Sequence, residues 1–226
     1  MLSARESFTH LVELASAPEQ RHALAGELCD LLLDWPTIYP TGMRGQIEAL
    51  LKAISGELDA ETRQTVVERL AVGATISPSL LNEFFFDASL RTKRKILLRN
   101  GEPTDADRDG VDGVSDERLL VEATRAESHA ELAKMLAQVF SIPDDICERI
   151  LADKSGRALA VACKGVGVSR AKFSTLAVLA GDAREDSLDA CYRRLAAFDE
   201  IPEPAAARVL QFWRAKDATA LRHRAA

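Results

Sequence analysis

The residues of this chain best suited to chemistry form an acidic run near its middle. The run contains three aspartates at alternate positions, which are Asp105, Asp107 and Asp109. An EF-hand calcium loop opens in this way, because oxygens at positions 1, 3 and 5 surround the ion, and a glycine such as Gly110 at position 6 allows a sharp turn. Position 12 departs from the template, since Asp116 stands where the loop has a bidentate glutamate. The pattern predicts either a calcium-modulated loop over 105–116 or a solvated acidic linker.

A second candidate is a helix-turn-helix over 162–176, in which Gly167 would occupy the turn. The apolar positions of the motif would be Ala162, Val166, Val168, Phe173 and Leu176. The second helix would present four polar side chains to a DNA groove, namely Arg170, Lys172, Ser174 and Thr175. The other interpretation is a plain helical hairpin with a glycine turn. A formal net charge of −6 argues against a dedicated nucleic-acid binder, because phosphate contacts need clustered cations.

Basic side chains gather immediately before the acidic run. Arg91, Lys95 and Arg99 are spaced i, i+4 and i+8, so they share one helical face. Lys93 and Arg94 lie beside them in the sequence. The pattern predicts either a surface for an anion or an acidic partner, or an ordinary solvated face.

No template for an enzyme is present. Ser169 and Lys172 have a Ser-x-x-Lys spacing without any supporting motif, and the four histidines are scattered with no zinc-binding spacing. The four cysteines form no C-x-x-C pair, which is typical of a reduced intracellular protein. We therefore expect no catalytic residues and no cofactor.

The elements that would carry these residues are helices. Leu132, Leu136 and Val139 belong to one of several apolar sets at i, i+3, i+4 and i+7, which is the spacing of one helical face. No segment alternates apolar and polar residues long enough to indicate a strand. The run 84–86 holds three adjacent phenylalanines, which cannot share one face, so their helix is either buried on most sides or leaves one ring exposed for docking.

The Gly- and Asp-rich segment 101–114 separates an N-terminal half, 1–100, from a C-terminal half, 115–226. These halves could be two domains or one continuous domain. A shift of about 66 residues aligns the segment from Ile76 with the segment from Ile142, and each copy contains an Asp-x-Ser step whose serine, Ser89 or Ser155, would cap the next helix. The repeat favours an all-α stack of helical hairpins, a HEAT- or armadillo-like α-solenoid.

The first residues show no secretory signal, and no apolar run approaches the roughly 20 residues that cross a bilayer. We expect a cytoplasmic protein without a membrane partner.

Two segments carry a resemblance to a known family: LADKSGRALAVACKGVGVSRAKFSTLAVLA over 151–180, and FDEIPEPAAARVLQFWR over 198–214. Together with RHALAGELCDLLLD and ISPSLLNEFFFD in the N-terminal half, they resemble an alphaproteobacterial group of all-helical proteins catalogued as a domain of unknown function. The most specific part is Asp153, Ser155 and Gly156 with the Gly-x-Ser-Arg step at Gly167. The resemblance implies a helical, HEAT-like fold and brings no catalytic residues.

The sequence thus favours a non-catalytic protein-interaction or regulatory scaffold whose partner is another protein, because stacked hairpins hold extended surfaces rigidly. The alternatives are a DNA-binding protein that uses 162–176 and a calcium-modulated module that uses 105–116.

Overall fold

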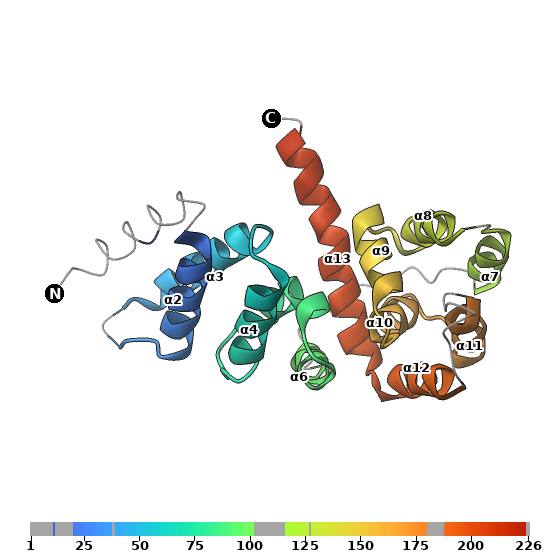
Figure 1. Ribbon diagram of the computed structural model, residues 1–226, viewed down its shortest axis with the longest axis horizontal. Coiled ribbons are helices and arrows are strands. Elements are labelled where there is room, and N and C mark those ends of the chain that lie inside the picture. The colour runs from blue at the N-terminus through green and yellow to red at the C-terminus, as the bar shows by residue number, and fades with distance from the viewer. Residues whose placement is uncertain are drawn as a thin grey trace. The chain divides into compact units, whose positions relative to one another are not determined.

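The computed structural model describes residues 11, 20–37, 39–101, 116–126, 128–179 and 188–224, and over these ranges it is helical without a strand (Figure 1). The all-α prediction is therefore confirmed. The chain forms two compact units, Met1–Ile96 and Leu97–Ala226. The boundary between the units falls inside a helix, α6, ahead of the acidic segment at which we divided the sequence.

The N-terminal unit contains α2 (Arg21–Leu33), α3 (Thr41–Ser55), α4 (Ala60–Leu70), α5 (Pro78–Glu83), the 3-10 helix η2 (Phe85–Asp87) and the start of α6 (Leu90–Asn100). Helix α2 packs against α3 and α4, while α3 contacts α5 and α4 contacts η2. Side chains cap two of these helices, α4 and α5. The Asp59 carboxylate accepts a hydrogen bond from the Thr62 N–H at 2.7 Å, and the Ser77 hydroxyl accepts one from the Leu80 N–H at 3.2 Å.

The three phenylalanines lie where α5 gives way to η2. Phe84 and Phe85 are fully buried and Phe86 is half-buried, so the prediction of burial on most sides is confirmed. The change from α to 3-10 geometry after Glu83 redirects successive side chains, which lets two adjacent rings enter the core.

The C-terminal unit contains α7 (Asp116–Arg125), α8 (His129–Phe140), α9 (Asp144–Ala152), α10 (Arg157–Gly165), α11 (Arg170–Leu179), α12 (Leu188–Glu200) and α13 (Glu203–Arg224). Helix α10 is central, since it contacts α9, α11, α12 and α13, and all of its residues except Lys164 are buried (Figure 1). Gly165 permits the close approach of α13: a Cβ at this position would lie 3.0 Å from the carbonyl oxygen of Ala206. Helix α11 packs on α12 and also on α7.

The helix starts follow the 66-residue register to within one residue. Helix α5 begins at Pro78 and α9 begins 66 residues later at Asp144, whereas α6 begins at Leu90 and α10 begins 67 residues later at Arg157. Together with the family resemblance, this register is what favours a HEAT-like stack, whose solenoid arrangement stays a prediction.

The predicted serine caps differ in position between the two copies. Ser89 accepts a hydrogen bond from the Thr92 N–H at 3.3 Å, as predicted. In the second copy the N-cap position of α10 is occupied by Gly156 at φ 66°, one residue after the predicted Ser155. The Ser155 hydroxyl still accepts a hydrogen bond from the first N–H of α10, that of Arg157, at 3.2 Å. The Asp153 carboxylate accepts a further one from the Ala158 N–H at 2.9 Å.

No helix in the described ranges is long and apolar enough to cross a membrane.

Candidate functional site

The segment 162–176 forms the helical hairpin that the sequence predicts. Helix α10 ends at Gly165, the chain turns at Gly167 with φ 76°, and α11 begins at Arg170. All five apolar positions of the pattern are buried, namely Ala162, Val166, Val168, Phe173 and Leu176. The hairpin therefore exists, and its function depends on what the outer face of α11 presents.

Two of the candidate DNA-contacting residues on α11, Arg170 and Ser174, form hydrogen bonds within the protein. The Arg170 Nε donates to both carboxylate oxygens of Asp199 on α12, at 2.8 and 3.1 Å. This hydrogen bond raises the pKa of Arg170 and lowers the pKa of Asp199. The Ser174 hydroxyl donates to the Ala171 carbonyl at 2.6 Å. Lys172 is half-buried and Thr175 is exposed.

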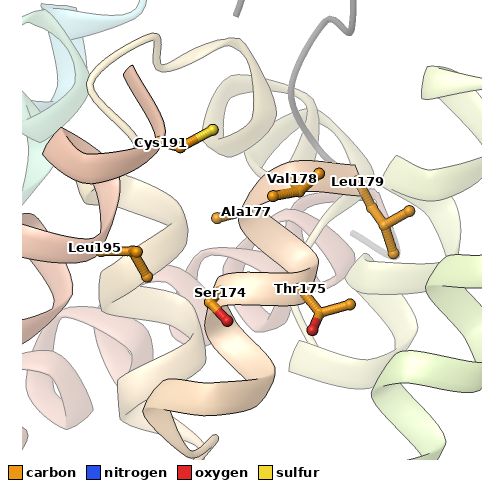
Figure 2. A pocket seen from close by; sticks show the side chains of 7 residues that line it. All are labelled: Ser174, Thr175, Ala177, Val178, Leu179, Cys191 and Leu195. Atoms are coloured by element: carbon orange, nitrogen blue, oxygen red, sulfur yellow. The ribbon is translucent and has the colours of Figure 1, made fainter. Parts of the chain in front are cut away.

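An apolar groove lies where α11 runs beside α12, and it has a volume of about 400 Å³. Its lining residues are Ser174, Thr175, Ala177, Val178 and Leu179 on α11, with Cys191 and Leu195 on α12. Figure 2 shows Cys191 and Leu195 projecting from one helix beside Ala177 and Val178 of the other. The chemistry of this lining suits an apolar side chain and offers few polar groups for orienting a small polar ligand.

Two large apolar side chains of the lining are exposed, and a third exposed side chain follows the lining residue Cys191 in the sequence. Val178 is 60% exposed, Leu179 is 41% exposed, and Tyr192, next to Cys191 in the sequence, is 68% exposed. Single exposed apolar residues are ordinary, but a concentration of them around a hollow is typical of an interaction surface. Tyrosine in particular is enriched where proteins bind each other.

Buried contacts join the helices on either side of the groove. The rings of Phe173 and Phe198 stack with their centroids 4.5 Å apart, and both residues are buried. The Lys164 ammonium lies 4.8 Å from the centre of the Phe198 ring and donates to the Phe198 carbonyl at 2.8 Å. At the end of α11 the Arg194 guanidinium donates to the Ala177 carbonyl at 3.1 Å. These contacts hold the two helices at a fixed separation.

The basic residues predicted to form a surface lie on α6, and the structure separates them. Arg91 and Arg94 are exposed, whereas Lys95 and Arg99 are half-buried. Lys93 is only 5% exposed, and its ammonium lies 5.6 Å from the centre of the Phe85 ring. The placement of Lys93 on this surface is thus wrong, because a single residue step on a helix turns the side chain by about 100° toward the core.

Most of the predicted calcium loop lies outside the described residues, including Asp105, Asp107 and Asp109. Asp116 is the first residue of α7. Within the part of the chain that the structure describes, no group of three or more His, Cys, Asp or Glu side chains could hold a metal ion.

Comparison with known families identifies the chain. A family model described as "uncharacterised protein conserved in bacteria (DUF2336)" matches residues 42–211. The chain belongs to the DUF2336 family. The match extends from α3 into α13 and includes every residue that lines the groove. No curated protein and no solved structure matches the chain.

The sequence of this DUF2336 member predicts that the groove residues belong to apolar helix faces, and it does not predict that they line a groove. One feature of the sequence indicated an apolar surface at this end of α11: after Leu176 the helix continues as Ala177-Val178-Leu179, with few polar groups for contact with DNA. Cys191 and Leu195 fit the apolar stripe of α12, and nothing local distinguishes them from core residues.

Burial suppresses the reactivity of the thiols that lie away from the groove. Burial raises the pKa of Cys29 to about 11, although the nearby Arg69 opposes this shift. Burial likewise raises the pKa of Cys147 to about 12. Cys163 is also buried, and Cys191 in the groove is the half-buried exception among the four cysteines.

We therefore expect a thiol reagent to modify the native protein once, at Cys191, because a thiolate must be both formed and accessible to react. Ellman's reagent at neutral pH should release about one equivalent of product from the native chain and about four after unfolding in denaturant. Cys191→Ser should abolish the native reaction. Full native reactivity of Cys191→Ser would mean that another thiol is accessible.

Proposed function

We propose that this DUF2336 protein is a non-catalytic protein-binding module, built as a stack of helical hairpins, whose docking surface is the α11–α12 groove. The observation that carries the proposal is the exposure of Val178 and Leu179 in the lining of a preformed apolar hollow, with the exposed Tyr192 next to the lining residue Cys191 in the sequence. Full burial of an exposed Val or Leu side chain is worth about 1.5–3 kcal/mol, and a partner that covers Val178 and Leu179 gains the share of it that belongs to their exposed fractions.

Two contacts favour a protein partner over DNA at this hairpin. Arg170, the first residue of α11, forms an ion pair with Asp199. The outer face of α11 after Thr175 is apolar. Recognition of a DNA groove needs polar groups at the N-terminal part of the recognition helix, together with cations for the phosphates.

The proposal is tested by placing two charges in the groove. The variant Val178→Glu/Leu179→Glu should lose its partner, because a buried carboxylate without a counter-charge is costly at an interface. The matched control is Val72→Glu/Leu90→Glu, which makes two apolar-to-Glu changes at the exposed positions Val72 and Leu90 of the N-terminal unit.

Each purified chain carries a photo-crosslinking amino acid at Tyr192 and is incubated with native lysate before irradiation. The expected result is a specific crosslinked protein for the parent and for the Val72→Glu/Leu90→Glu control, and its loss from Val178→Glu/Leu179→Glu. Identical products from all three chains, or no crosslinked protein in any of them, would exclude the groove as a docking surface.

A further inference from the structure

We draw no further inference here: the strongest candidate, the apolar groove between α11 and α12, belongs to the docking site already described, and nothing in the structure shows what covers it.

Discussion

Replacing Phe173 with alanine is expected to destabilise the C-terminal unit by about 3–5 kcal/mol, the cost typical of removing a fully buried aromatic ring. Phe173 is fully buried and stacks on Phe198, whose ring also lies against the Lys164 ammonium. The substitution would leave a cavity between α11 and α12 and remove one ring of the stack. We expect a large effect because Phe173 is fully buried and its stack with Phe198 joins α11 to α12.

Urea unfolding followed by tryptophan fluorescence measures this effect. The chain has two tryptophans, Trp35 in the N-terminal unit and the buried Trp213 in the C-terminal unit. A Trp35→Phe background therefore confines the signal to Trp213. Tyr192→Ala serves as the control, since its largely exposed ring should contribute less than about 0.5 kcal/mol. Similar midpoints for Phe173→Ala and Tyr192→Ala would contradict the assigned role of the stack.

Gly156→Ala is expected to destabilise the same unit by about 2–4 kcal/mol, for two separable reasons. Gly156 has φ 66°, a conformation that L-residues with a side chain rarely adopt. In addition, an added Cβ would lie 2.3 Å from Cγ of Arg194 and 3.1 Å from its Cβ. Arg194 has little freedom to withdraw, because its own Cβ is among the crowded atoms.

Gly167→Ala isolates the backbone contribution. Gly167 has φ 76°, and a Cβ there would meet no atom within 4 Å, so only the conformational cost of about 1–2 kcal/mol applies. The difference between the two glycine variants in the Trp213 unfolding midpoint then measures the crowding at Arg194. Equal destabilisation by both variants would show that α12 moves aside at no cost.

The crowding at Gly156 also concerns function, because Arg194 joins the start of α10 to the end of α11. Its aliphatic part lies against Gly156 while its guanidinium holds the Ala177 carbonyl in the groove. The glycine therefore permits the position of a side chain that holds a lining residue of the groove. This link explains why a backbone feature outside the groove should matter for binding.

Several features of the fold follow directly from local sequence patterns. Apolar spacing of 3.6 residues predicts the helices, proline and side-chain caps such as Asp59 and Ser77 predict where α4 and α5 begin, and the glycine turn predicts the hairpin around Gly167. These signals act within one or two helical turns, so they need no knowledge of the rest of the chain. At α10 the serine was predicted as the N-cap itself, whereas Gly156 takes that position and the Ser155 hydroxyl accepts from the Arg157 N–H beyond it.

The sequence by itself determined that this protein is all-helical and that 162–176 forms a helical hairpin. Only the tertiary structure decided which apolar residues remain in water, since Val178 and Leu179 are no less hydrophobic than the buried Leu176 beside them. It also decided that Lys93 is buried against Phe85 and that Arg170 is paired with Asp199, 29 residues away. The physical reason is that periodicity assigns a residue to a face of its own helix, whereas exposure and charge pairing depend on the neighbours that distant segments bring to that face.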